Sequence, residues 1–167
     1  MNVYAQVPEN STTELKQALD YTIYEFYFRR IQFFEKLATK SEKAGRSGSV
    51  ARSILRKELR LTDSQRHILN TLTQVGSQAL ADAASVDAKA ANIIEREHSQ
   101  YRRVKLLKPP TVPWELKQLQ ESRNAIFKNA ISRLSQQIDD TSFQQINSRI
   151  KAVILPKVSV GQSTNSK

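Results

Sequence analysis

Hydrophobic positions recur at helical spacing along most of the chain. The first such segment begins near Ser11, where Ser11 and Glu14 have the spacing of a capping box, and it ends before Gly45. Its apolar stripe consists of Leu15, Leu19, Ile23, Phe26, Phe33 and Leu37. Aromatic residues between Tyr21 and Phe34 widen this stripe. The pattern predicts a first long helix whose aromatic residues form the main aromatic part of the core.

A short helical segment and a long one follow. Residues 45–49 are rich in glycine and serine and predict a loop before a short helix over 50–59. Thr62 and Gln65 then repeat the capping-box spacing. From there a helical pattern continues to about Leu107.

Prolines separate the last two helical segments from the long one. Three of the six residues 108–113 are proline, and they predict the end of the long helix because proline is not tolerated inside one. Pro113 suits the first turn of the next helix. Thr141 and Gln144 have capping-box spacing and predict the start of the last helix, which Pro156 ends.

The length of the third segment restricts the possible shapes. A helix of about 45 residues would be about 68 Å long, whereas a compact chain of this size has a radius of gyration of about 15 Å. Either the helix breaks near Gly76, or the molecule is elongated, with the helix after Pro113 running back along it. We favour the second shape. We therefore predict an all-α fold, an elongated helical hairpin or a bundle of about five helices with one long central helix.

Residues 11–156 form one helical domain in this prediction, with polar ends at 1–10 and 157–167. Val3-Tyr4-Ala5 fits the small-residue pattern of a signal-peptide cleavage site, although no apolar stretch precedes it. The first ten residues are therefore either a signal-peptide remnant, with Met1 not the true start, or a disordered tail. If these residues are a signal-peptide remnant, the protein is periplasmic or secreted. If they are a disordered tail, a cytoplasmic location is the alternative. We expect the last eleven residues to be a disordered tail.

Composition then excludes several kinds of protein. The chain of 167 residues has no cysteine, which excludes disulfides and thiolate metal sites. No run of apolar residues is long enough to predict a transmembrane helix. The only histidines, His67 and His98, would lie about 46 Å apart on one helix. Because no phosphate-binding loop or nucleophile motif occurs either, we predict no enzyme activity, no cofactor and no metal.

Positive charge is concentrated in residues 29–66 and, to a smaller extent, in residues 96–108. The net charge is +10, and residues 29–66 hold 11 Lys and Arg against 4 Asp and Glu. Within this part, Arg52, Arg56, Lys57 and Arg60 cover one side of the short helix. These four residues predict a basic face that attracts a protein or another anionic partner. The alternative interpretation is a solvated helix surface without a partner.

One segment resembles the helix-turn-helix of bacterial regulators. Residues 61–69 and 80–87 fit its pattern, with Ser85 where that family has glycine in the turn. The resemblance implies a cytoplasmic DNA-binding protein that uses residues 61–96. However, residues 67–95 carry a net charge of −2, which does not suit a DNA-reading helix. A continuous alanine-rich helix is the other interpretation, and we rank nucleic acid below protein as a partner.

Two further motifs carry a second resemblance. Leu61, Thr62 and Gln65 form an L-T-x-x-Q motif, and Thr141 and Gln144 repeat its T-x-x-Q part. The pattern resembles the LTxxQ group of small periplasmic helical stress proteins. The resemblance implies an elongated helical hairpin, a basic concave homodimer and chaperone-like or envelope-stress activity. The order of segments also resembles secreted helical bacterial proteins, through the motif at Pro113, Glu115, Leu116, Leu119 and Gln120. We therefore expect a non-enzymatic extracytoplasmic interaction protein.

Overall fold

The chain is helical throughout most of the part that the structure describes. The computed structural model describes residues 9–104 and 112–158, with side chains at 20–101 and 112–157. Its elements are α1 (Glu9–Lys43), α2 (Ser49–Leu59), the 3-10 turn η1 (Asp63–Gln65), α3 (Arg66–Val104), α4 (Trp114–Gln137) and α5 (Asp140–Val158). The predicted all-α fold of about five helices is confirmed, and no strand occurs in the described ranges.

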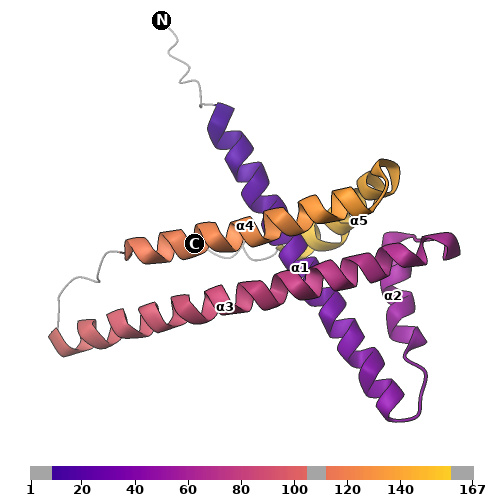
Figure 1. Cartoon of the computed structure of the whole chain (residues 1–167), viewed down its shortest axis with the longest axis horizontal. Helices are drawn as coiled ribbons and strands as arrows, with labels where there is room; N and C mark the ends of the chain where they lie inside the picture. The colour runs from indigo at the N-terminus through magenta and orange to yellow at the C-terminus, as the bar shows by residue number, and fades with distance from the viewer. Residues whose placement is uncertain (1–8, 105–111, 159–167) are drawn as a thin grey trace, which may run out of the picture.

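The central helix α3 is long and continuous. Its 39 residues correspond to a length of about 58 Å. Figure 1 shows α4 running back alongside α3, so the two helices form the predicted elongated hairpin. Gly76 lies inside α3 and does not break it. The predicted continuation towards Leu107 and the proline-rich turn extend into residues 105–111, which lie outside the described residues.

The first helix, α1, crosses the hairpin near its middle (Figure 1). α2 returns beside the C-terminal half of α1 after the loop that contains Gly45. Gly45 has a φ of 72°, a conformation that glycine adopts without strain. α5 packs against α1, α2 and α4. All the other helices therefore use α1 as a shared support.

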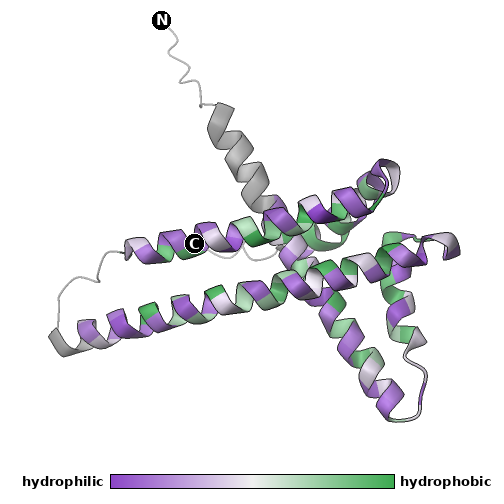
Figure 2. Ribbon diagram, viewed as in Figure 1, coloured by the Kyte–Doolittle hydropathy of each residue, from purple (hydrophilic) through white to green (hydrophobic). Residues whose placement is uncertain are grey.

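The core lies where these helices meet one side of α1. Its fully buried large side chains come from all five helices and include Tyr24, Tyr27, Phe28, Leu55, Leu59, Ile68, Leu72, Phe127, Leu134, Ile146 and Ile150. Phe28 stacks against Phe127 with the ring centroids 6.5 Å apart. In Figure 2 each helix carries hydrophobic and hydrophilic residues in alternation, as expected for helices that bury one side. The predicted aromatic segment is therefore the centre of the core.

Three residues of the predicted apolar stripe do not belong to this core. Phe26, Phe33 and Leu37 are 48%, 57% and 40% exposed, respectively. The sequence stripe was too wide for one buried face, because α2, α3, α4 and α5 cover only one side of α1. The prediction that the aromatic segment is mainly buried holds for Tyr24, Tyr27 and Phe28, and it is wrong for Phe26 and Phe33.

Two helices begin one or two residues earlier than predicted. α1 begins at Glu9, two residues before Ser11. α5 begins at Asp140, and the residue that caps it is Asp139, whose Oδ1 accepts a hydrogen bond from the backbone N–H of Ser142 at 2.9 Å. The carboxylate of Asp139 satisfies an otherwise unpaired N–H at this helix start, so Thr141 is not needed there.

The last helix extends further than the sequence predicted. α5 continues to Val158 and contains Pro156, which we predicted would end it. A proline in the last turn removes only one backbone hydrogen bond, and the helix continues past it. The helical domain therefore extends beyond residue 156. The predictions for residues 1–8, including Val3-Tyr4-Ala5, and for 159–167 lie outside the described residues.

Candidate interaction surface

Two of the four predicted basic-face residues form ion pairs within the molecule. Arg52 of α2 contacts two carboxylates of α1, with its Nε 3.1 Å from Glu35 Oε2 and its Nη1 2.5 Å from Glu42 Oε1. These bonds raise the pKa of Arg52, with the hydrogen bond to Glu42 as the largest cause. Arg52 therefore ties α2 to the end of α1, and its charge is largely compensated.

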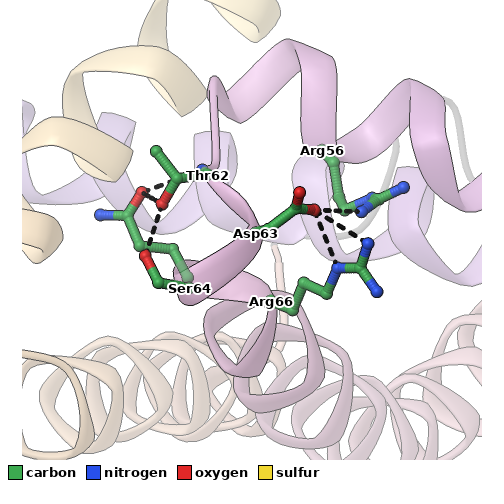
Figure 3. Close-up of polar contacts among 6 residues, drawn as sticks. Arg56, Thr62, Asp63, Ser64 and Arg66 are labelled. Atoms are coloured by element: carbon green, nitrogen blue, oxygen red, sulfur yellow. Dashed lines mark hydrogen bonds and ion pairs between the residues drawn. The ribbon is translucent and has the colours of Figure 1, made fainter.

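Asp63 of η1 pairs with two arginines, Arg56 of α2 and Arg66 of α3. Figure 3 shows its side chain between those of Arg56 and Arg66. Asp63 Oδ1 lies 3.5 Å from Arg56 Nη1 and 2.8 Å from Arg66 Nη2. The Asp63 side chain is 86% exposed, so these pairs are screened by water and contribute little to stability. They do lower the net positive charge of this part of the surface.

Lys57 and Arg60 remain as the uncompensated cations of the predicted basic face. Both are exposed, and neither has an acidic partner among the residues described in the structure. Arg60 ends α2 in the left-handed conformation, with a φ of 53°, and its backbone N–H bonds to the carbonyls of Arg56 and Lys57. The structure thus brings the four predicted residues together on α2, with two free cations and two paired ones.

An open pocket of ≈ 330 Å³ lies beside the paired arginines. Its lining combines three arginines with polar residues and one apolar residue, namely Glu42, Ser47, Ser49, Arg52, Arg56, Arg66, Leu69 and Asn70. Because Glu35, Glu42 and Asp63 already pair with these arginines, the pocket offers no excess positive charge.

The L-T-x-x-Q motif has a structural role that the geometry makes clear. Thr62 and Gln65 form the predicted capping box, in which Gln65 Oε1 accepts a hydrogen bond from the Thr62 backbone N–H at 3.1 Å. Gln65 Nε2 also donates to Ser142 Oγ of α5 at 3.2 Å. Leu61 packs against the edge of the core. The motif therefore joins the start of α3 to α5.

The second copy of the motif has no corresponding role. Thr141 and Gln144 are exposed on α5, and Asp139 provides the cap that they were predicted to form. The interpretation of Thr141 and Gln144 as a capping box is therefore wrong. Only one of the two matching spacings in the sequence acts as a cap.

The predicted turn of the helix-turn-helix is also absent. Residues 84–87 lie within the continuous α3, in the same helix as Lys89 and Arg96. Without a turn, no separate recognition helix exists in residues 61–96, and the continuous alanine-rich helix is the correct interpretation. The DNA-binding alternative thereby loses the feature on which it rested.

The outer face of α1 is an apolar surface that the sequence analysis assigned to the core. At about 100° per residue, Phe26, Phe33 and Leu37 fall within about 40° of one another around the helix. They form a straight exposed stripe about 17 Å long. We call these three residues the α1 stripe. Large apolar residues aligned in this way are typical of a surface that binds a partner.

A basic edge runs parallel to the α1 stripe. Arg29, Lys36 and Lys40 each follow a stripe residue by three positions, and so lie about 60° to one side of it. This repeated spacing was the signal in the sequence that could have identified the surface. On the opposite side, Arg30 pairs with Glu58 and stacks over the Phe34 ring at 4.9 Å, so the described side chains of α1 offer no free cation there.

A groove of ≈ 460 Å³ lies on the basic side of the stripe. It is lined by residues of α1 and one residue of α3, namely Gln32, Glu35, Lys36, Thr39, Lys40, Lys43 and Ser77. Glu35 is the one acidic residue of this lining, and Arg52 occupies its carboxylate. The three lysines have no acidic partner within the described ranges, so the groove carries an uncompensated positive charge.

One arginine of α4 fixes the position of α1 across the hairpin. Arg123 Nη2 lies 2.5 Å from Glu25 Oε1 of α1, and its Nε lies 2.9 Å from Asp87 Oδ1 of α3. Burial alone raises the pKa of Glu25, but the hydrogen bonds and charges of Arg123 and Arg29 outweigh it, so this pKa is lower than usual. Arg123 thus connects three helices and holds the α1 stripe on the side away from them.

The described side chains suggest no metal site. No group of three or more His, Asp or Glu side chains in the described ranges could hold a metal ion. His67 lies at the start of α3, where its Nδ1 is 3.1 Å from the Ser64 carbonyl oxygen. Nor does any helix in those ranges have the length and apolar character needed to cross a membrane.

Comparisons with known proteins found no matching family model, no matching curated protein and no matching solved structure. The surface on α1 and the residues around it therefore carry the functional argument.

Proposed function

We propose that this protein is a non-enzymatic helical interaction protein that binds exposed apolar segments of other proteins along the α1 stripe. This is a chaperone-like function, in line with the resemblance to the LTxxQ group. We further propose that it acts outside the cytoplasm.

The observation that carries this proposal is the exposure of Phe26, Phe33 and Leu37 in one straight row. Burial of apolar area is the main favourable term in protein association, and large apolar side chains supply most of it. Because Arg123 and the core hold α1 in place, the stripe is already arranged before a partner arrives. A preorganised surface loses less conformational entropy on binding.

A second copy of the chain fits this stripe poorly. Two stripes packed face to face in antiparallel orientation would bring the basic edges of both copies, with Arg29, Lys36 and Lys40, close together. In parallel orientation each basic edge would face the side of Arg30, where Glu58 is already paired. Like charges at an interface oppose association. The charge distribution therefore favours a different protein as the partner over a homodimer formed through α1.

An aggregation assay tests the proposed function. A client protein unfolded by reduction or heat is monitored by light scattering, with and without this protein. We expect the unmodified protein to slow client aggregation. We expect most of this effect to be lost in the triple variant Phe26→Ser, Phe33→Ser, Leu37→Ser. Wild-type protection by the triple variant would contradict the proposal.

A matched control removes apolar residues elsewhere. Ile94, Val112 and Trp114 are also exposed and lie on the α3–α4 hairpin away from the α1 stripe. The variant Ile94→Ser, Val112→Ser, Trp114→Ser loses the same number of exposed apolar side chains, and we expect it to protect the client like the wild type. Fractionation of cells that produce the protein from its complete gene tests the proposed compartment.

A further inference from the structure

We propose that the segment bound along α1 is an acidic amphipathic one, whose apolar residues contact the α1 stripe and whose carboxylates contact Lys36, Lys40 and Lys43. This inference rests on the proposed function and specifies the chemistry of the partner. Nothing in the L-T-x-x-Q motif or in the basic face of α2 contributes to it.

The groove beside the α1 stripe carries free positive charge. Lys36, Lys40 and Lys43 all line this groove of ≈ 460 Å³, and none has an acidic partner among the described residues. Their neighbour Glu35 accepts hydrogen bonds from Arg52 Nε at both carboxylate oxygens, at 3.1 and 3.3 Å. Three positive charges are therefore available to an incoming segment, in contrast to the paired arginines of α2.

The α1 stripe and the lysines beside it lie on the same helix. The α1 stripe extends about 17 Å along the helix axis, and the three free lysines flank its C-terminal part over about 10 Å, whereas Arg29 is paired with Glu25. A partner helix of similar length, with apolar residues on one face and Asp or Glu beside them, can pair with both rows at once. The apolar row supplies affinity, and the carboxylates select the partner and its orientation.

The three free lysines all lie on one side of the α1 stripe. On the other side of the stripe, Arg30 is closed off by its ion pair with Glu58. Positive charge along one edge distinguishes a partner that has its own acidic edge from one with acids on the wrong side. A fluid anionic bilayer has no such asymmetry, so the arrangement favours a protein segment over a lipid surface.

Peptide binding tests this inference. One synthetic helical peptide carries Leu at the spacing of Phe26, Phe33 and Leu37, with Glu three residues after each Leu. Its partner peptide has Gln in place of every Glu. Binding to the full-length protein is measured by fluorescence anisotropy. At low salt we expect the Glu peptide to bind about tenfold more tightly, and the difference to shrink near 0.5 M salt, where the Debye length is only about 4 Å.

Two charge-matched variants locate the effect. Lys36→Glu, Lys40→Glu, Lys43→Glu alters the groove, whereas Lys89→Glu, Lys117→Glu, Lys128→Glu alters exposed lysines of α3 and α4 by the same total charge. Circular dichroism verifies that both variants remain helical. We expect only the groove variant to lose the preference for the Glu peptide.

The outcomes separate the two proposals. Equal binding of both peptides, abolished by the Phe26→Ser, Phe33→Ser, Leu37→Ser variant, would overturn the acidic-partner inference and leave the proposed function intact. Equal loss of preference in the two lysine variants would also overturn it, because net charge alone would then explain the result. Tight binding to phosphatidylglycerol vesicles with no binding of either peptide would overturn both proposals and identify the surface as a lipid-binding one.

Discussion

Gly76 of α3 lies directly against the ring of Phe28 of α1. A Cβ atom at position 76 would be 2.5 Å from Phe28 Cδ1 and 2.8 Å from Phe28 Cγ, closer than real side chains approach. The glycine therefore lets the two helices cross at this point, where Phe28 also stacks on Phe127 of α4. A residue that weakens α3 as an isolated helix is the one that permits its tertiary contact.

Gly76→Ala is therefore expected to destabilise the protein. Helix propensity alone would favour alanine by about 1 kcal/mol, but overpacking against Phe28 costs about 1–3 kcal/mol. We expect a net loss of about 1 kcal/mol in urea unfolding. Ser85→Ala at an exposed position of α3 is the control, and it should be neutral or slightly stabilising. A more stable Gly76→Ala variant would show that the helices can move apart freely.

Removal of Arg123 should expose the dependence of α1 on its ion pair. The Glu25 side chain is only 13% exposed, so Arg123→Met leaves a carboxylate with poor access to water and one partner fewer. We expect a loss of about 2 kcal/mol at neutral pH. Arg66→Met, at a side chain that is 63% exposed, should change stability by less than about 0.5 kcal/mol. Similar losses in the two variants would contradict the importance of the Arg123 junction.

The pH dependence of stability follows from the same pair. The pKa of Glu25 in the folded protein is lower than its ordinary value of 4.5. A depressed folded-state pKa adds stability above the unfolded-state pKa, and this stability is lost as the pH falls through the folded-state pKa. The wild type should therefore lose stability below about pH 4.5. The difference between wild type and Arg123→Met should narrow there, and urea unfolding between neutral and acidic pH measures it.

Two buried tyrosines should respond oppositely to the loss of their hydroxyl groups. The hydroxyl of Tyr27 is buried and has no hydrogen-bond partner in the part of the chain that the structure describes. The hydroxyl of Tyr24 donates to Asn147 Oδ1 at 3.2 Å. Tyr27→Phe is expected to be neutral or to stabilise by up to about 1 kcal/mol, and Tyr24→Phe to destabilise by about 1 kcal/mol. Thermal unfolding of both variants checks the difference, and a clear loss in Tyr27→Phe would reveal a partner for that hydroxyl.

Replacement of the two glutamines of the repeated motif should have different effects on stability. Gln65 caps η1 and bonds to Ser142, whereas Gln144 is exposed on α5. Gln65→Ala is expected to cost about 1 kcal/mol, since it removes both a cap and a link between helices. Gln144→Ala should change stability by less than about 0.5 kcal/mol. Equal effects in denaturant unfolding would contradict the structural role of the first motif.

Charge reversal of the four residues of the predicted basic face should affect stability at Arg52 and Arg56 but not at Lys57 and Arg60. Arg52→Glu with Arg56→Glu places new carboxylates beside Glu35, Glu42 and Asp63 and should cost about 1 kcal/mol of stability after screening by water. Lys57→Glu with Arg60→Glu should leave stability within about 0.5 kcal/mol. If the basic face of α2 attracts acidic partners, only the second pair gives an interpretable loss of association, visible at low salt. Unchanged association in that pair would argue against this face.

The sequence by itself determined the elements of this protein. Helical periodicity located all five helices, because the spacing of apolar residues reflects the local geometry of the backbone. It also identified the Thr62–Gln65 cap and the long helical segment that contains α3, which are local properties. It was less accurate at the ends of the helices, because α1 begins before Ser11, Asp139 caps α5 in place of Thr141, and α5 tolerates Pro156.

Only the tertiary structure decided which side of α1 is buried. An aromatic stripe that covers most of a helix gives no local sign of which part will contact its neighbours, and the crossing of α1 over the hairpin excluded Phe26 and Phe33. The tertiary structure also decided which basic residues are paired. Arg52 and Lys57 look alike in the sequence, and they differ only in whether an acidic residue of another helix lies within reach. Long-range packing is set by contacts between segments far apart in the chain, and local periodicity does not contain them.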